Sequence, residues 1–223
     1  MDVLILSKTH MNNGKCCIGG ITGSGRYVRL LTPTGENQPE NTDLNPRQVW
    51  EVEFTERPNM TPPHVEDVLV SSRKIKGSLK DEITILEFIK QRKIEIWQGS
   101  PDILFDGKIK WTNNGSGFIS KEAVSEHSVG FWIADKDLTK SIYFNKPRYS
   151  YYGSNGWRSL PYVGFDEPLE IIPKGTLIRV SLARWWDTKG TTEFRCPLQL
   201  SGWYDINEMP KKSTIDLSDD LPF

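Results

Sequence analysis

The sequence predicts a mainly β fold: two small barrels joined by one α-helix and a linker, followed by a disordered acidic tail. Three observations support this prediction. Short segments of alternating apolar and polar residues recur along the chain, and turns rich in glycine and proline separate them. A single stretch has the period of an amphipathic helix. The residues after 204 are polar and acidic, a composition that does not support a packed core.

Residues 1–77 are expected to form the N-terminal barrel. Trp50, Val52 and Phe54 alternate with charged residues, as in a strand that buries one face. Five short strands suit a small closed barrel, because closure removes the exposed sheet edges. These strands are predicted at residues 3–7, 15–21, 26–31, 48–55 and 66–74.

Residues 78–127 are expected to form the helix and the linker. Apolar side chains recur at helical spacing between Lys80 and Trp97, and Ser78 is the predicted N-cap. Glycine and asparagine residues within 112–117 indicate the linker.

Residues 128–204 are expected to form the C-terminal barrel, and residues 205–223 the flexible tail. Trp185, Trp186 and Trp203 are predicted to fill the core of this barrel, since tryptophan is highly buried on average. The strands are predicted at residues 129–134, 141–145, 160–165, 176–186 and 194–204.

The composition argues against several classes of protein. No apolar run approaches the roughly 18 residues of a membrane-spanning helix, and residues 1–7 lack the basic region of a secretory signal. We therefore expect a cytoplasmic protein with no membrane partner. Cys16 and Cys17 are adjacent and the third cysteine is distant, which argues against a disulfide framework. The three histidines are scattered, so neither a metal nor another cofactor is expected.

The charge is unevenly distributed along the chain. The formal net charge is −1, but residues 205–223 carry −3 and the remaining body carries +2. A mildly basic body is compatible with nucleic-acid binding, which needs a basic groove and not a basic protein.

The tail ends in a distinctive acidic and aromatic motif. It resembles the C-terminal tip of bacterial single-stranded DNA-binding proteins, in which aspartates precede an apolar residue, proline and phenylalanine. Such a tip works at the end of a flexible chain, where the ring fills an apolar pocket and the carboxylates meet a basic rim. We therefore predict a partner protein with a basic-rimmed pocket. The docking residues are Asp219, Asp220, Leu221, Pro222 and Phe223.

Basic and aromatic residues interleave in the second half of the chain, in a segment predicted to be a loop because it contains glycine, serine and asparagine. Single-stranded nucleic acid is bound by such sets, because every base has a π-face and every linkage carries a phosphate. A hairpin whose tyrosines pack against the barrel remains the alternative interpretation. A smaller set lies on an early strand, and one arginine precedes two tryptophans. The candidate binding residues are Lys146, Arg148, Tyr149, Tyr151, Tyr152, Trp157, Arg158, Arg26, Tyr27, Arg29 and Arg184.

Segments near both ends of the body carry a family resemblance. Ile5–Thr9, Cys17–Gly20 and Arg29–Leu31, together with Ser181–Trp186 and Gln199–Tyr204, resemble the dual OB-containing domain. This prokaryotic family is predicted to contain two OB folds and is often associated with anti-phage conflict systems. The resemblance covers residues 1–204 and implies two OB-like barrels and nucleic-acid binding.

The favoured hypothesis is a binder of single-stranded nucleic acid, with DNA favoured over RNA, that recruits a partner through its tip. One alternative is a protein-binding adaptor that imitates the tail of a single-stranded DNA-binding protein. Another is a nucleic-acid-processing enzyme. Catalysis is not expected, because the paired carboxylates Glu51 and Glu53 lie on an alternating face and Gly23-Ser24-Gly25 lacks the ending of a phosphate loop.

Overall fold

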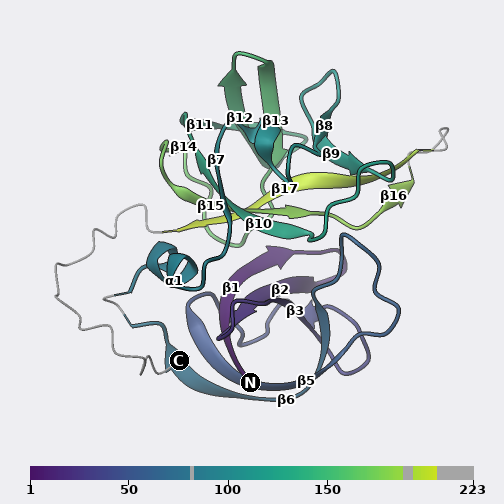
Figure 1. Cartoon of the computed structure of the whole chain (residues 1–223), viewed down its shortest axis with the longest axis vertical. Coiled ribbons are helices and arrows are strands. Elements are labelled where there is room, and N and C mark those ends of the chain that lie inside the picture. Colours follow the sequence, from purple (N-terminus) through teal and green to yellow (C-terminus); the bar gives the residue numbers. More distant parts are fainter. Residues whose placement is uncertain (81–82, 188–192, 205–223) are drawn as a thin grey trace. The chain divides into compact units, whose positions relative to one another are not determined.

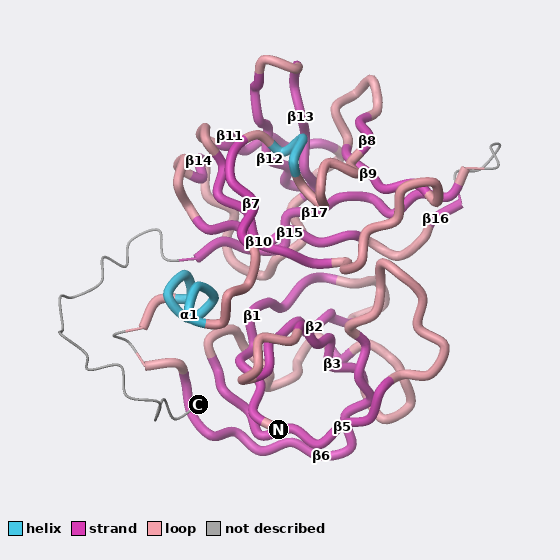
Figure 2. The backbone as a smooth tube through the Cα atoms, in the orientation of Figure 1, coloured by secondary structure: helices cyan, strands magenta, loops and turns pink. Residues whose placement is uncertain are grey.

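The computed structural model describes residues 1–80, 83–187 and 193–204. These residues divide into two compact units (Figure 1). Among these residues the first unit holds Met1–Pro58 and Asp67–Ile94, and the second holds Asn59–Glu66 together with the described residues from Glu95 to Tyr204. Strands dominate both units (Figure 2). The mainly β prediction is therefore confirmed.

Five strands of the first unit close into a ring. β1 pairs with β2, β2 with β3, β3 with β6, β6 with β5, and β5 returns to β1. All these pairs are antiparallel except β3 and β6, which run parallel. The strands are β1 (Asp2–His10), β2 (Lys15–Thr22), β3 (Tyr27–Leu31), β5 (Gln48–Glu56) and β6 (Asp67–Ser78), and the short β4 (Gln38–Pro39) extends β2. This is an OB-like barrel.

A close approach between β1 and β2 requires glycine at position 20 of this barrel. A Cβ atom at Gly20 would lie 2.8 Å from the Leu4 carbonyl oxygen and 2.7 Å from Val3 Cγ1. Val3 and Leu4 are fully buried, so neither group has open space to move into. The Gly19-Gly20 pair noted in the sequence thus allows two strands to pack tightly at the barrel wall.

The helix is shorter than the sequence pattern predicts. α1 (Ile85–Gln91) begins after Thr84, whose side chain accepts a hydrogen bond from the Glu87 backbone N–H while the Glu87 carboxylate binds the Thr84 backbone. Ser78, the predicted N-cap, is the last residue of β6. Lys93 has a positive φ of 54°, which ends helical geometry, and Trp97 lies in β7 (Ile96–Gly99). The prediction of one helix over 80–97 was wrong at both ends.

The second unit contains the remaining strands. Residues 112–117, predicted as a linker, form the turn between β8 (Lys110–Trp111) and β9 (Gly117–Ser120) and include the first residue of β9. The strands of the second unit are β7 (Ile96–Gly99), β8 (Lys110–Trp111), β9 (Gly117–Ser120), β10 (Val129–Ala134), β11 (Leu138–Tyr143), β12 (Lys146–Gly153), β13 (Gly156–Pro161), β14 (Ile171–Ile172), β15 (Leu177–Leu182), β16 (Trp186–Asp187) and β17 (Phe194–Tyr204). The 3₁₀ turn η1 (Pro101–Ile103) follows β7.

The second unit repeats the ring order of the first. β10 pairs with β15 and β15 with β17, while β11 pairs with β12 and β12 with β13. β10 and β11 are separated only by Asp135–Asp137 and together replace β1 of the first barrel. Just past β13, Tyr162 bridges Leu200 of β17 in parallel, and the Val163 N–H donates to the Leu200 carbonyl at 3.0 Å. The fold is therefore two OB-like barrels with equivalent strand order.

Large aromatic residues fill the core of the second barrel. Trp132 and Tyr149 are fully buried, and Trp203 packs against the same cluster. Trp185 also packs there, but 56% of Trp186 is exposed, because β16 lies on an arm that pairs only with the start of β17. The prediction that Trp186 belongs to the core was wrong.

No helix among the described residues is long and apolar enough to cross a membrane.

The capping box at Thr84 gives a direct test of where α1 begins. Thr84→Ala removes a cap from the backbone N–H of Glu87, and we expect the free energy of unfolding to fall by about 1 kcal/mol. Thr84→Ser should retain most of this stability, since serine caps equally well. Ser78→Ala, at the exposed end of β6, serves as the control and should change little. Urea denaturation of the three variants measures the difference, and a larger loss at Ser78 would contradict the observed boundary.

Candidate nucleic-acid interface

Strands β11, β12 and β13 present an outer face on the second barrel. Alternation along β12 directs Tyr149 and Tyr151 into the core and places Lys146, Arg148 and Tyr152 on the opposite face. The same face therefore carries cationic and aromatic side chains in one row. We call the outer face of these three strands the β12 face.

Cross-strand pairing extends this row onto both neighbouring strands. Tyr143 of β11 lies opposite Lys146, and Trp157 of β13 lies opposite Tyr152. Directly opposite residues in an antiparallel pair share one face of the sheet. Tyr143 is 58% exposed, Tyr152 65% and Trp157 41%. Three partly exposed aromatic residues thus share this sheet face with the two cations of β12.

Arg148 is held on this face by neutral oxygens. Its Nε donates to Ser159 Oγ at 2.7 Å, and its Nη2 donates to Ser116 Oγ at 3.1 Å and to the Ser159 carbonyl at 2.9 Å. No carboxylate among the described residues forms an ion pair with it. Burial lowers the pKa of Arg148 from its ordinary value, and the nearby Tyr143 acts in the opposite direction. The guanidinium is therefore fixed in position and its charge is not neutralised.

Within the described chain, six other arginines form ion pairs with carboxylates, whereas Arg148, like Arg179, donates to neutral oxygens. A guanidinium that already binds a carboxylate has less attraction left for a phosphate. The arginine ion pairs are Arg26–Glu56, Arg29–Asp67, Arg57–Asp67, Arg73–Asp43, Arg158–Asp102 and Arg195–Glu193.

Two predicted binding residues do not reach the surface. Tyr149 is fully buried and donates to the Leu169 carbonyl at 2.8 Å, while Tyr151 is 2% exposed and donates to Asp135 at 2.8 Å. Neither ring has a free face on which a base could stack, so both are corrected to core residues. The sequence placed them in a loop, whereas they lie in a strand whose alternation turns them inward.

Arg158 and Arg184 lie away from the β12 face. Arg158 lies directly opposite Tyr151 across the β12–β13 pair, on the core side of the sheet. Its Nε donates to Asp102, and its guanidinium carbon lies 4.7 Å from the Trp111 ring centroid. Arg184 is exposed in the segment between β15 and β16, close to Trp186 in the chain. The structure therefore brings together Lys146, Arg148, Tyr152 and Trp157 and separates the two other arginines from them.

The predicted platform of the first barrel is largely engaged in ion pairs. Arg26 makes a bidentate pair with Glu56 at 2.6 and 2.7 Å. Arg29 is 13% exposed and donates to the buried Asp67, and Tyr27 is half-buried on the same strand. Arg26, Tyr27 and Arg29 thus offer less open cationic surface than the β12 face.

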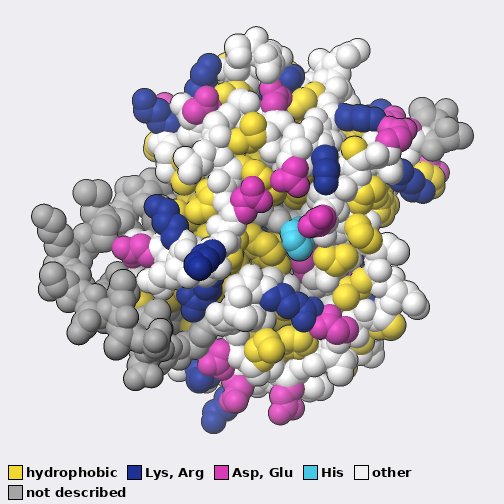
Figure 3. All heavy atoms as spheres, in the orientation of Figure 1, with side chains coloured by type: hydrophobic (Ala, Val, Ile, Leu, Met, Phe, Trp, Pro, Cys, Tyr) yellow, Lys and Arg dark blue, Asp and Glu magenta, His cyan; other side chains and the backbone are white. Residues whose placement is uncertain are grey.

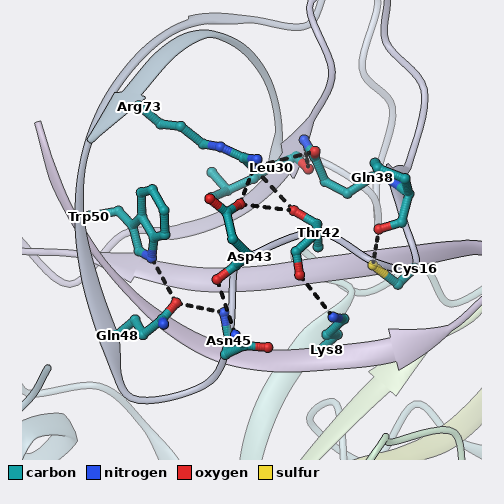
Figure 4. Close-up of polar contacts among 11 residues, drawn as sticks. Lys8, Cys16, Leu30, Gln38, Thr42, Asp43, Asn45, Gln48, Trp50 and Arg73 are labelled. Atoms are coloured by element: carbon teal, nitrogen blue, oxygen red, sulfur yellow. Dashed lines mark hydrogen bonds and ion pairs between the residues drawn. The ribbon is translucent and has the colours of Figure 1, made fainter. Parts of the chain in front are cut away.

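A polar network in the first barrel is likewise satisfied internally (Figure 4). Arg73 of β6 donates to Asp43 at 2.7 Å and to Thr42 at 3.3 Å, and its guanidinium carbon lies 5.5 Å from the Trp50 ring centroid. Lys8 donates to the Thr42 carbonyl at 3.1 Å. These contacts hold the connection between β3 and β5 against the barrel and occupy its cations.

Charges of both signs are interspersed on the visible face of the molecule (Figure 3). This pattern agrees with the small net charge of the body and does not form a broad basic patch. Attraction for an anionic ligand therefore has to come from local arrangements, such as an arginine without a carboxylate.

No group of three or more metal-ligating side chains occurs within the described parts of the chain. The predicted docking residues Asp219, Asp220, Leu221, Pro222 and Phe223 lie outside the described residues.

Sequence reasoning missed two components of the β12 face. Ser116 approaches Arg148 only because the turn after β8 pairs with β13, where Ser116 bridges Ser159. Such a contact between distant segments has no local signal. Tyr143 could have been found from its position opposite Lys146 across a two-residue hairpin turn.

Comparison with known proteins adds a family to this geometry. The model of the dual OB-containing domain matches residues 1–203. The chain belongs to this family. The two OB-like barrels of this dual OB protein span the matched residues, with β17 ending at Tyr204. No curated protein matches the sequence.

Several solved structures are similar to the dual OB protein at low identity. One is a murine DNA-binding protein bound with double-stranded DNA, with 9% identity, a TM-score of 0.31, and coverage of 90% of this chain and 91% of that chain. Another is the Ifi202 HINa domain in complex with 20-bp double-stranded DNA, with 8% identity, a TM-score of 0.33, and coverage of 90% and 96%.

The buried tyrosines predict a loss of stability in alkali. Burial raises the pKa of Tyr151 to about 12, and its bond to Asp135 acts in the same direction. Burial also raises the pKa of Tyr149 and Tyr162. The unfolded chain loses these protons near the ordinary value of 10.0, before the folded chain does. Stability should therefore be intact below pH 10 and fall as the pH rises toward 12.

Urea denaturation across this pH range measures the effect, with tyrosinate absorbance as a second readout. Tyr151→Phe cannot ionise at this position, so the variant should lose less of its stability over the same range. An identical pH dependence for the variant and the unaltered protein would contradict the assignment.

Proposed function

We propose that the dual OB protein binds single-stranded nucleic acid on the β12 face, with DNA favoured over RNA. The observation that carries this proposal is the Arg148 guanidinium, which neutral oxygens hold on the same sheet face as three exposed aromatic residues and which has no carboxylate partner among the described residues. Nucleic-acid binding also agrees with membership of a family defined by two OB domains.

The chemistry of the face matches a strand with unpaired bases. Arg148 and Lys146 supply positive charge for phosphates, while Tyr152, Trp157 and Tyr143 supply flat surfaces for bases. At about 3.3 Å per residue, β12 keeps Lys146 and Tyr152 roughly 20 Å apart, which accommodates a short extended strand. Bases within a duplex already stack on each other, so the exposed rings favour single strands.

The β12 face also has the position that OB folds use for ligands. Oligonucleotides bind OB barrels across the second and third strands of the ring. In the second barrel these strands are β12 and β13, because β10 and β11 together form the first. The cation and two of the rings therefore lie on the strands that OB folds use for oligonucleotides.

We further propose that residues 219–223 recruit a partner protein. A phenylalanine after Leu221 and Pro222 fits an apolar pocket, and Asp219 and Asp220 fit its basic rim. The likeness of this segment to the tip of bacterial single-stranded DNA-binding proteins also favours DNA as the ligand. A role in defence against phage stays a prediction that depends on the family resemblance.

Two other functions follow from the same features. An adaptor would use residues 219–223 without binding oligonucleotides, and a nucleic-acid-processing enzyme would degrade or modify them. We propose binding without catalysis, and incubation of labelled oligomers with purified protein and divalent metal tests this directly.

Fluorescence titration with oligothymidine tests the β12 face. Arg148→Gln should lower affinity about tenfold at low salt and reduce the salt dependence by about one phosphate contact. Tyr152→Ala should lower affinity by about fivefold or more, because stacking contributes roughly 1–3 kcal/mol per base. Lys146→Gln should act as Arg148→Gln does, without touching the hydrogen bonds to Ser159 and Ser116.

The matched control is Lys174→Gln, which removes one exposed positive charge from the loop between β14 and β15. It should change affinity by less than about twofold. Parallel titrations with RNA and duplex oligomers measure the preference for DNA and for single strands. If the unaltered protein binds none of these oligomers at low salt, the proposed function fails.

Capture of a pocket protein tests the proposed docking segment. Phe223→Ala should reduce binding of a bacterial protein that recognises single-stranded DNA-binding protein tips by about tenfold or more, because the ring anchors the contact. Affinity for oligothymidine should stay unchanged. Calorimetry with the purified pocket protein measures both variants, and equal binding by Phe223→Ala would contradict docking through this residue.

A further inference from the structure

The turn between β11 and β12 presents an aromatic residue in an unfavourable backbone conformation. Phe144 and Asn145 form the two-residue turn, with φ values of 48° and 57°. Both therefore lie in the left-handed region, as a type I′ hairpin turn requires. Asparagine is common there, but a bulky residue such as phenylalanine is an outlier.

The side chain of Phe144 gains no burial in return for this strain. Phe144 is 82% exposed, and its neighbours Ile142 and Tyr143 are 62% and 58% exposed. A residue that only closed the turn would be asparagine or glycine. Strained residues without a packing role occur at functional sites, so the conformation of Phe144 indicates a function for the tip of the β11–β12 hairpin.

The two rings of the tip form one unit. Tyr143 and Phe144 meet edge to face, with ring centroids 4.5 Å apart. Tyr143 also lies opposite Lys146, which places a cation beside the rings. The protruding ring is therefore supported on one side and flanked by positive charge.

The charge around the tip favours an anionic ligand. The segment from Thr139 to Arg148 contains two lysines and one arginine and no acidic residue. Lys140 pairs with Glu170, which leaves Lys146 and Arg148 on the β12 face nearest the tip. An exposed apolar ring next to these cations matches a base stack with its phosphates.

We propose that Phe144 is a wedge that inserts at the end of a duplex, where the duplex meets a single strand, and unstacks the last base pair. This inference rests on the proposed function, since β12 would lead the single strand toward the tip. A ring that projects past the end of the sheet cannot support a strand lying on the sheet, but it can contact bases beyond it. Apolar side chains inserted at base steps unstack them in this way.

The variant Phe144→Asn distinguishes a role of Phe144 in contacting bases from a role in stabilising the fold. Asparagine suits a left-handed turn position, so this variant should fold with a melting temperature higher by about 2–4 °C. It should also lose the contact with bases. Phe144→Leu keeps an apolar side chain and serves as the matched control, because leucine is also used as a wedge.

The probe is an oligonucleotide with an oligothymidine arm and a short duplex whose first base pair contains 2-aminopurine. The unaltered protein should raise the 2-aminopurine fluorescence by unstacking that base, and should bind this junction about fivefold or more tightly than plain oligothymidine. Phe144→Asn should abolish the fluorescence increase and the preference, and keep its affinity for plain oligothymidine within about twofold. Phe144→Leu should retain part of both signals.

Several results would overturn the wedge. Phe144→Asn could keep the fluorescence increase, or its melting temperature could fall, which would show that Phe144 serves the fold. Binding of anionic vesicles that depends on Phe144, without any junction signal, would assign the tip to a lipid surface. In each case binding of oligothymidine to the β12 face would persist. Failure of the unaltered protein to bind any oligomer would instead reject the proposed function itself.

Discussion

The organisation of the candidate site depends on how the Arg148 guanidinium is held. Its hydrogen bonds reach Ser159 on the adjacent strand and Ser116 on the turn after β8, so three segments of the second barrel fix one side chain. Serine hydroxyls and a carbonyl satisfy its donors without cancelling its charge. A carboxylate in the same place would have given a structural ion pair, as at Asp102 for Arg158. The choice of neutral partners therefore keeps a positioned cation available on the β12 face.

The two barrels use the same ring of strands but differ in how many aromatic side chains they expose. In the first barrel, Arg73 and Arg26 reach carboxylates, and the contacts of Arg73 fasten the long connection after β3. In the second, the exposed aromatic residues gather on hairpins and arms that extend from the barrel. Every aromatic residue that is strongly exposed among the described residues lies in the second unit: Tyr143, Phe144, Tyr152, Trp157, Trp186 and Phe194. The same strand order thus occurs in a first barrel whose Arg26 and Arg73 pair with carboxylates and in a second barrel that exposes several aromatic side chains.

Local patterns predicted the five strands of the first barrel and β10, β15 and β17 of the second, because alternation and turn residues are encoded in adjacent positions, but they missed β12 and the shorter strands. The class of fold and the β10 and β17 boundaries followed from them. The helix was overextended because apolar residues of β7 continued its spacing, and only the positive φ at Lys93 separates the two elements. Within the site, alternation could have distinguished buried Tyr151 from exposed Tyr152, had residues 146–153 been assigned to a strand. The contribution of Ser116 depends on tertiary pairing and could not be read from the sequence.

The division of the chain into units does not follow sequence order. Asn59–Glu66 lies between β5 and β6 of the first barrel yet belongs to the second unit, where Glu66 accepts hydrogen bonds from the backbone N–H and the hydroxyl of Ser128. The backbone thus passes between the units at residues 58–59, 66–67 and 94–95. Expression of residues 95–204 alone would strip the second barrel of a buried acceptor and leave Ser128 unpaired. A fragment that keeps the second barrel intact therefore has to include Asn59–Glu66, for example through a circularly permuted chain.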